Sequence, residues 1–265
     1  MDIKNIESSL LNNNAKIFWP FYNELYEKKE KGEVLIDRTG CKIVELLAPK
    51  ICIPMSEDND GFIDFSCRKS PRKYIEKEGA WYDSHSLSID KVSDVQMWTC
   101  VCDKTLQINS NYGYLVFDKG NYNQFEHAAL RLESQKQTRE AIIIYNRPSI
   151  QLEVNDLGGQ DFICTLDQHF FIRSNLEGDD SLVCITEMRS NDCITGTFSD
   201  IPWFTSVYKK MYDRLLKTYP DLKYGEMIFI PNSFHCYERN FDKLEGIIKG
   251  WTKEELEKNY PKVSK

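Results

Sequence analysis

The sequence of 265 residues predicts an α/β (α+β) fold in which helices cover a large mixed sheet. Two observations support this fold class. Short apolar runs rich in β-branched and aromatic residues are separated by turn signals, as in the strands of a sheet; these runs are 141–145, 161–165, 169–172, 182–188 and 226–231. Between them, apolar residues recur at helical spacing. Because no repeat, low-complexity tract or linker divides the chain, we expect one domain over residues 1–265.

The first half of the chain is predicted to alternate helices, strands and loops. Its elements are amphipathic helices within 1–32, two strand-like runs within 34–49 that a turn at 37–40 separates, a loop at 55–73, a helix at 74–86, and a turn into a strand at 108–117.

The second half contains two further amphipathic helices and a charged end. Apolar spacing predicts a helix at 121–139 and another at 202–219, which ends before Pro220. Residues 242–265 are predicted to form a charged, solvent-facing C-terminal helix.

Composition and charge exclude several classes of protein. The net charge of −7 argues against a nucleic-acid binder, which would need a basic face. The polar start and the absence of a long apolar run predict neither a signal peptide nor a membrane span. Nine cysteines, an odd number, fit a reducing cytoplasm with free thiols. Cys100 and Cys102 lack a second pair at metal-ligand spacing, so we expect no metal site.

Chemically informative residues concentrate between Asp161 and Asp200. Cys164 lies in an apolar run, and a second apolar run leads into the polar residues of 189–192. Arginine offers a planar fork for phosphate and favours thiolate over thiol. The pattern therefore indicates a nucleophilic cysteine beside an anion site, although an arbitrary apolar cysteine is more often inert.

Several motifs occur in an order that resembles the thymidylate synthase superfamily, and within it the deoxycytidylate hydroxymethylase branch known from T-even phages. They are INSNYG, RPS, DFICT, MRSND with Gly196, Asp200, and HCYERNF, within about residues 37–241. The resemblance implies a homodimer with the sheet at its interface, a pyrimidine nucleotide substrate, and 5,10-methylenetetrahydrofolate as the one-carbon donor.

The resemblance also assigns residues to the nucleotide phosphate. Arg189 and Ser190 would bind it, and Arg38 would clamp it from a mobile loop. Arg139 would reach the phosphate bound by the partner subunit. The family has a second arginine directly after this one, but this chain has Glu140 there. A carboxylate would repel the phosphate, so the set of phosphate ligands is incomplete without a substitute. Arg147 is the natural substitute.

Base, sugar and catalytic roles follow in the same way. Cys164 would attack C6 of the base, with Tyr112 lining its surroundings. Asp200, where thymidylate synthases have asparagine, points to cytosine, because a carboxylate accepts from the amino group and can share a proton with N3. Asn191 is the residue of the hydroxymethylase branch. His235 and Tyr237 alternate on an extended segment and would bind the sugar 3′-hydroxyl.

The folate side is assigned to four residues by the resemblance: Glu78, Trp98, Asp192 and Gly196. Glu78 would order water and move protons. A second family tryptophan is replaced by Val101, and the apolar C-terminal tail is missing, which fits a site altered toward hydroxymethylation.

The predicted function is therefore hydroxymethylation of dCMP at C5. Three alternatives remain open: a CMP-preferring hydroxymethylase of a nucleoside-antibiotic or thiamine-antimetabolite pathway, a thymidylate synthase or cytidylate C5-methylase, and a nucleotide-binding homologue without turnover.

Overall fold

The computed structural model describes residues 3–104, 107–157 and 160–261. Their buried apolar side chains form one hydrophobic cluster. The strands form two ladders, a five-stranded sheet in the order β3-β8-β6-β5-β4 and a four-stranded sheet in the order β1-β2-β9-β7. The fold class is thus confirmed, but the strands divide between two sheets where the sequence predicted one.

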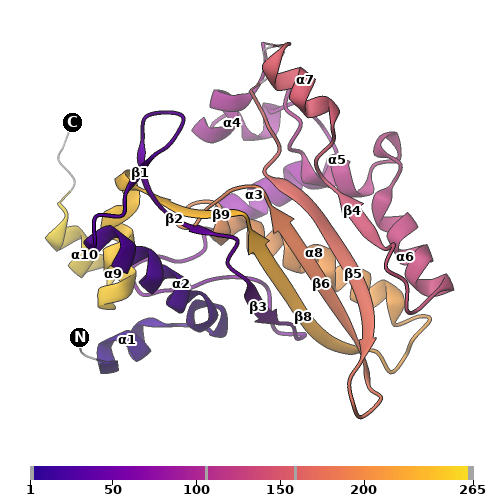
Figure 1. Cartoon of the computed structure of the whole chain (residues 1–265). Helices are drawn as coiled ribbons and strands as arrows, with labels where there is room; N and C mark the ends of the chain where they lie inside the picture. Colours follow the sequence, from indigo (N-terminus) through magenta and orange to yellow (C-terminus); the bar gives the residue numbers. More distant parts are fainter. Residues whose placement is uncertain (1–2, 105–106, 158–159, 262–265) are drawn as a thin grey trace.

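The five-stranded sheet supplies the platform of the molecule. Its strands are β3 (Ile51–Pro54), β8 (Lys223–Pro231), β6 (Asp180–Met188), β5 (Thr165–Ser174) and β4 (Ile142–Ile144). β6 and β8 are parallel, and the other neighbours are antiparallel. Helix α8 (Thr197–Leu215) connects β7 to β8 and covers one face, while the other face turns toward the viewer in Figure 1.

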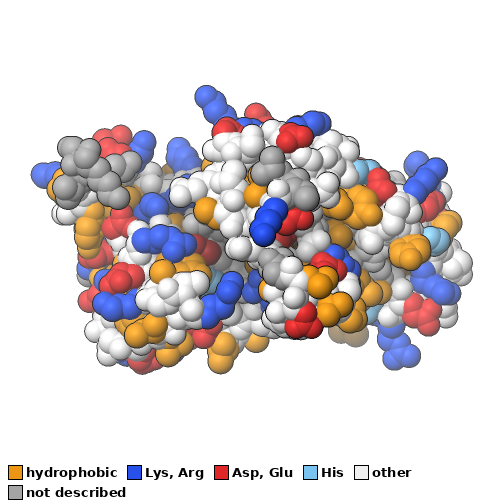
Figure 2. Space-filling model, turned by 90° about the horizontal axis from the view of Figure 1, so that it is seen from above, with side chains coloured by type: hydrophobic (Ala, Val, Ile, Leu, Met, Phe, Trp, Pro, Cys, Tyr) orange, Lys and Arg blue, Asp and Glu red, His pale blue; other side chains and the backbone are white. Residues whose placement is uncertain are grey.

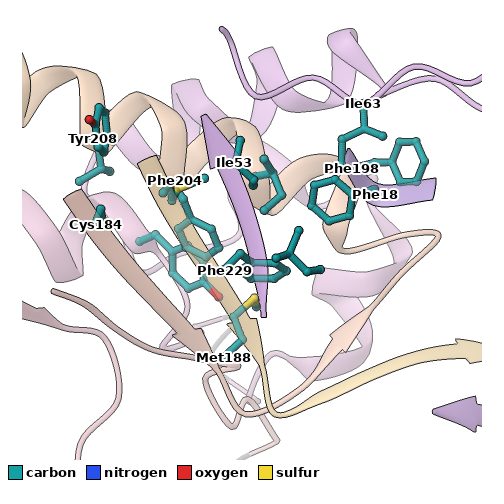
Figure 3. Packing of buried hydrophobic residues seen from close by; sticks show 14 of the residues in the cluster. Phe18, Ile53, Ile63, Cys184, Met188, Phe198, Phe204, Tyr208 and Phe229 are labelled. Atoms are coloured by element: carbon teal, nitrogen blue, oxygen red, sulfur yellow. The ribbon is translucent and has the colours of Figure 1, made fainter. Parts of the chain in front are cut away.

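Large apolar side chains fill the layer between α8 and the sheet. Phe204 and Tyr208 of α8 meet Cys184 and Phe229 of the strands, and all four are fully buried (Figure 3). Burial of such side chains contributes roughly 1.5–3 kcal/mol each. The layer therefore fixes the position of the first turn of α8, which carries Asp200.

The four-stranded sheet lies beside the platform. It consists of β1 (Leu35–Ile36), β2 (Lys42–Leu47), β9 (Ser233–Tyr237) and β7 (Asn191–Asp192). The terminal helices pack near it (Figure 1), and they are α1 (Ile3–Ser9), α2 (Asn13–Glu30), α9 (Phe241–Lys249) and α10 (Lys253–Asn259). The predicted N-terminal helices within 1–32 correspond to α1 and α2.

Two neighbouring parallel strands pass from one sheet to the other at the same level. Two residues separate β6 from β7, and one residue, Asn232, separates β8 from β9. The Asn232 amide donates to the carbonyl of Met188 over 2.7 Å. The segment between β6 and β7 carries Arg189 and Ser190, so this crossing lies at the candidate site.

A third group of helices, mostly short, packs at the other end of the platform. Its members are α3 (Arg72–Asp83), α4 (Gln96–Val101), α5 (Tyr112–Phe117), α6 (Gln124–Ser134) and α7 (Ser149–Asn155), with the 3-10 turns Asp90–Val92, Lys119–Asn121 and Glu238–Asn240 elsewhere in the chain. A Cβ on Gly113 would lie 1.9 Å from the carbonyl oxygen of Tyr82. Only glycine therefore permits α5 to lie this close to α3.

Three sequence predictions were wrong in detail. Residues 112–117 form α5 where a strand was predicted, because the Asn111 side chain accepts from the Tyr114 amide over 2.8 Å and caps a helix. The run 161–165 is not a strand of its own: β5 begins only at Thr165 and continues through 169–172. Cys164 thus lies just before the strand. The predicted helix 202–219 begins five residues earlier, at Thr197.

The C-terminal prediction was also wrong in part. Residues 242–261 contribute to two helices separated at Gly250, whose φ of 67° ends α9. Leu244, Ile247 and Ile248 of α9 are buried, so this helix belongs to the core. α10 is the charged, exposed helix, and residues 262–265 of the predicted range lie outside the described residues. No helix in the described parts of the chain is long and apolar enough to cross a membrane.

Candidate active site

Cys164 and Arg189 lie side by side at the end of the β5–β6 ladder. The Arg189 amide donates to the Cys164 carbonyl over 2.8 Å. The guanidinium Nη2 lies 3.4 Å from Sγ of Cys164 and donates to the Phe162 carbonyl over 2.6 Å, while Nε donates to Ile163 over 3.1 Å. Arg189 therefore holds the backbone before the cysteine as well as its sulfur.

The ionisation of Cys164 is set by opposing influences. Burial raises the pKa of the thiol, the positive charges of Arg189 and Arg38 lower it, and the carboxyls of Asp200 and Asp161 raise it. The net direction is upward. Arg189 thus favours the thiolate as the sequence predicted, but burial outweighs it in the ligand-free protein.

Asp161, which sequence reasoning did not assign, anchors the cysteine segment. Its carboxylate accepts from the amides of Asn109 and Ser110 and from the Ser110 hydroxyl, each over 2.7 Å. These contacts join the segment before Cys164 to the loop before α5. The adjacent donors in the INSNYG motif were the only sequence signal for this partner.

Asp200 lies in the first turn of α8 and contacts Asn191 of β7. The Asn191 amide donates to Oδ2 of Asp200 over 2.8 Å, and the Thr197 hydroxyl donates to the Asn191 carbonyl oxygen. A Cβ on Gly196 would lie 3.1 Å from Oδ2 of Asp200 and 3.2 Å from the Asn191 amide nitrogen. Gly196 therefore leaves room for this contact.

The carboxyl of Asp200 favours its protonated form. Burial raises its pKa well above the ordinary range, and the nearby charges of Glu78 and Asp192 raise it further, while the Asn191 hydrogen bond lowers it. Tyr112 links this group to the cysteine: burial first, then the charges of Asp200 and Cys164, raise the pKa of its phenol. The structure thus brings these groups of the candidate site together.

Glu78 is buried on α3 among aromatic side chains. Burial raises its pKa to about 7, and hydrogen bonds from Tyr74 and Tyr82 lower it. Tyr82 stacks on Tyr112 with ring centroids 5.4 Å apart, and Tyr112 accepts from the Thr165 hydroxyl over 2.8 Å. The two tyrosines beside Glu78 were missed by sequence reasoning, although their spacing of four residues on a predicted helix was visible.

The residues predicted on the folate side occupy different surroundings. Trp98 packs on Trp81 with ring centroids 5.2 Å apart, and its buried indole N–H makes no hydrogen bond of ordinary geometry within the described residues. Asp192 accepts from the amides of Ile194 and Thr195 over 2.9 and 3.1 Å. The aromatic surface fits a flat cofactor, whereas the Asp192 carboxylate is partly used by its own turn.

His235 and Tyr237 lie on β9, as predicted, with ring centroids 4.9 Å apart. The Ser233 hydroxyl donates to Glu45 over 2.5 Å and lies 3.2 Å from Nδ1 of His235. Nδ1 also lies 3.3 Å from the Ser233 carbonyl oxygen. A proton on Nδ1 satisfies both contacts, which leaves Nε2 as an acceptor for a hydroxyl.

The remaining predicted phosphate ligands are not assembled. Arg38 is exposed in a turn that Asp37 caps, and Ser190 is half-buried with no side-chain hydrogen bond among the described residues. Arg139 is exposed next to His169, which bonds its carbonyl oxygen at 2.9 Å, and it lies apart from Cys164 along β5. Arg139 therefore does not join the site of its own chain.

Two neighbours of this region have other partners. Arg147, the predicted substitute, donates to Glu153 over 2.7 Å and to Asn109 over 2.8 Å. The Glu140 carboxylate lies 3.3 Å from Nε of Arg131 and forms an ion pair with it. The described residues contain no cluster of His, Cys, Asp or Glu suited to a metal. On the face in Figure 2, Lys and Arg side chains are interspersed with Asp and Glu.

Comparison with known proteins identifies the family of the chain. The thymidylate synthase family model matches residues 21–262. Deoxycytidylate 5-hydroxymethyltransferases of Enterobacteria phages T6, T4 and T2 are each 31% identical to this chain over 217 residues, which is 80% of this chain and 82% of the relative. The chain therefore belongs to the thymidylate synthase family.

Proposed function

We propose that this protein is a cytidylate 5-hydroxymethyltransferase, which transfers a one-carbon unit to C5 of dCMP, or of CMP, in the cytoplasm. The observation that carries the proposal is the hydrogen bond from Asn191 to the Asp200 carboxyl in the same site as Cys164 and Tyr112. Burial raises the pKa of this carboxyl, which favours its protonated form. The similarity to the phage enzymes supports the same activity.

Asp200 and Asn191 together suit the edge of cytosine. Because Asn191 donates to Oδ2, a protonated carboxyl would carry its proton on Oδ1, so that Oδ2 accepts and Oδ1 donates. Cytosine offers the reverse pair, an amino donor at position 4 and an acceptor at N3. Uracil offers an acceptor at position 4 and a donor at N3. The fixed order of donor and acceptor therefore favours cytosine.

Cys164 is the proposed nucleophile. Its thiolate adds to C6 of the ring, the new C–S bond takes the sulfur's electron pair, and C5 becomes nucleophilic. Asp200 supplies a proton to N3 as charge develops there. Tetrahydrofolate would leave from the transferred carbon as C5 loses its proton, water would add to the exocyclic methylene that remains, and expulsion of the thiolate would restore the ring.

The one-carbon donor is proposed to be 5,10-methylenetetrahydrofolate, which supplies carbon at the oxidation level of formaldehyde. Trp98, Asp192 and Gly196 are the residues proposed to hold it. The aromatic ring of Trp98, which packs on Trp81, supports this assignment. Glu78 is proposed to take a proton from the water that completes the hydroxymethyl group, because its pKa of about 7, raised by burial, suits a base at neutral pH.

Nucleotide binding is proposed to involve both subunits of a homodimer. Arg38, Arg189 and Ser190 would hold the phosphate, together with Arg139 of the second chain, and His235 and Tyr237 would bind the sugar 3′-hydroxyl. The proposed single catalytic domain spans 1–265.

The face of the platform opposite α8 is the proposed dimer interface. Ile142, His169, Ile185 and Ile228 align across four strands on that face, as the strand registers show. Ile228 is buried and the other three side chains are half-buried, so a partly open, mostly apolar row crosses the sheet, and such rows favour association. Arg139 lies next to His169 and would reach the neighbouring chain from there.

Release of tritium from 5-tritiated dCMP tests the proposal, because addition of the carbon unit displaces the hydrogen at C5. With methylenetetrahydrofolate present, we expect release and 5-hydroxymethyl-dCMP as the product. Formation of dihydrofolate with a methylated product would instead identify a methylase. Parallel assays with CMP and dUMP determine sugar and base preference. Tight dCMP binding without any release would leave the nucleotide-binding alternative.

A further inference from the structure

Three side chains of α3 share one face of the helix. Tyr74, Glu78 and Tyr82 are spaced four residues apart, which places them one above the other. The Tyr74 hydroxyl donates a short hydrogen bond to Oε1 of Glu78, and the Tyr82 hydroxyl, like that of Tyr74, lowers the pKa of Glu78. Glu78 thus accepts a hydrogen bond from the turn before it and lies under the influence of a second phenol from the turn after it.

No cation balances the Glu78 carboxylate among the described residues. The groups that interact with it are Tyr74 and Tyr82 of its own helix and Asp200 of α8, with Tyr112 of α5 stacked behind Tyr82. Its side chain is buried. Since a buried carboxylate is costly without a partner, the two phenol hydroxyls provide its main stabilisation when ionised.

The two tyrosines differ in what else they do. Tyr82 is almost fully buried and packs on Trp81, Tyr112 and Trp203. Tyr74 is half-buried, and no packed ring pair involves it among the described residues. Removing the Tyr74 hydroxyl therefore removes the hydrogen bond to Glu78 and the weaker interaction with the Trp98 indole, with little effect on the aromatic packing.

We propose that Tyr74 is a positioning residue, whose hydroxyl holds the Glu78 carboxylate ready to accept a proton and thereby sets the pH range of hydroxymethylation. This rests on the proposed function of the same site. Tyr74 acts through Glu78 and need not touch the nucleotide.

The direction of the effect follows from the hydrogen bond. Burial raises the pKa of Glu78 to about 7, and the Tyr74 hydroxyl lowers it by stabilising the charged form. Without that hydroxyl the pKa of Glu78 rises further. A step that needs ionised Glu78 then requires a higher pH.

The test compares Tyr74→Phe with the wild-type protein across pH 5 to 9. We expect the acid limb of the rate of 5-hydroxymethyl-dCMP formation to move up by about one pH unit, since a hydrogen bond to a charged group is worth about that much. The rate at pH 6 should fall about tenfold, while the rate at pH 9 changes less than about twofold. Tyr260→Phe is the matched control, because the Tyr260 hydroxyl also donates to a glutamate, Glu245, over 2.7 Å, away from the site.

A second measurement does not depend on turnover. Carbon-13 NMR of protein labelled at the glutamate carboxyl carbon follows the titration of Glu78, with Glu78→Gln used to assign its signal. We expect the titration midpoint to rise in Tyr74→Phe and to stay unchanged in Tyr260→Phe. Identical midpoints and superimposable rate profiles for Tyr74→Phe and wild type would overturn the inference. A wild-type protein that releases no tritium would defeat the proposed function alone, because the titration still reports on Tyr74.

Discussion

The two ends of the candidate site differ in how far one chain completes them. The base end comprises Cys164, Asn191, Asp200, Tyr112 and Glu78, and its members are buried or half-buried and linked through hydrogen bonds or direct electrostatic influence. The phosphate end comprises Arg38, Arg139 and Ser190. Its two arginines are exposed, and its members share no contact among the described residues.

This difference indicates which part of recognition is pre-organised. Buried polar groups must find partners during folding, so the base end is built before any ligand arrives. Exposed arginines remain hydrated until a phosphate and a second chain gather them. We therefore expect the base end to determine chemistry and base selection, and the phosphate end to determine affinity and its dependence on dimerisation.

The largest effect is expected from Cys164→Ala, which removes the nucleophile from the base end. Tritium release from dCMP should fall by about 10⁴-fold or more, as when a covalent nucleophile is deleted. Binding of dCMP, measured by calorimetry, should change little, because the phosphate end is intact. Cys100→Ala, at an exposed cysteine, serves as the control and should retain full activity.

Asp200→Asn tests base selection at the same end. An amide can present a donor and an acceptor but cannot give a proton to N3, so turnover of dCMP should fall about 100-fold or more. Binding of dUMP, measured under the same conditions, should improve. Turnover of dCMP within a few-fold of wild type would show that the proton of Asp200 is not used.

Glu78→Gln measures how much the buried carboxyl of Glu78 lowers the free energy of unfolding. A buried carboxyl whose pKa is about 7, against 4.5 ordinarily, binds protons more tightly in the folded protein, so the wild type loses stability as pH rises from about 4.5 through 7. Glutamine does not titrate. The free energy of unfolding of Glu78→Gln, measured with urea and compared with that of the wild type, should therefore gain up to roughly 3 kcal/mol between pH 4.5 and pH 8.

Glu177→Gln is the matched control for that measurement. Glu177 is exposed in the turn between β5 and β6, so its replacement should change stability by less than about 0.5 kcal/mol at either pH. An equal pH dependence in Glu78→Gln and wild type would contradict the ionisation assigned to Glu78.

Arg139→Ala addresses the phosphate end and is expected to have the smallest effect. Loss of one exposed phosphate contact should raise the KM for dCMP about tenfold with little change in kcat.

The stronger experiment mixes Arg139→Ala with inactive Cys164→Ala under conditions of subunit exchange. Mixed dimers contain one site with both residues intact, so about a quarter of wild-type activity should appear at low dCMP. Activity no higher than that of Arg139→Ala alone would place Arg139 outside the partner's site.

The sequence predicted the base end better than its surroundings. Cys164, Arg189, Asn191 and Asp200 occur in short motifs whose order carries the family resemblance, and the structure brings them together. Asp161 and Tyr74 were not assigned, because their roles depend on contacts between segments far apart in the chain or on burial, which a motif does not display.

The errors in the fold have related causes. The apolar run at 112–117 fits a strand by composition, but its capping residue Asn111 and the glycine-dependent approach to α3 select a helix. The ionisation of Cys164 was predicted from one neighbour, Arg189, whereas burial and two carboxyls oppose it. Predictions from local sequence succeed where one short segment determines the structure or ionisation of a residue. They fail where contacts from several segments determine it.

The paired crossing of β6 to β7 and β8 to β9 has a consequence for how the protein responds to its ligand. A nucleotide held at Arg189 and Ser190 would clamp both ladders at their shared junction, so their opening motions become one cooperative unit. Amide hydrogen exchange should then slow together in β2 and in β5, on either side of the junction, once dCMP is added. Through this junction, binding of one small molecule would stabilise both sheets against local unfolding.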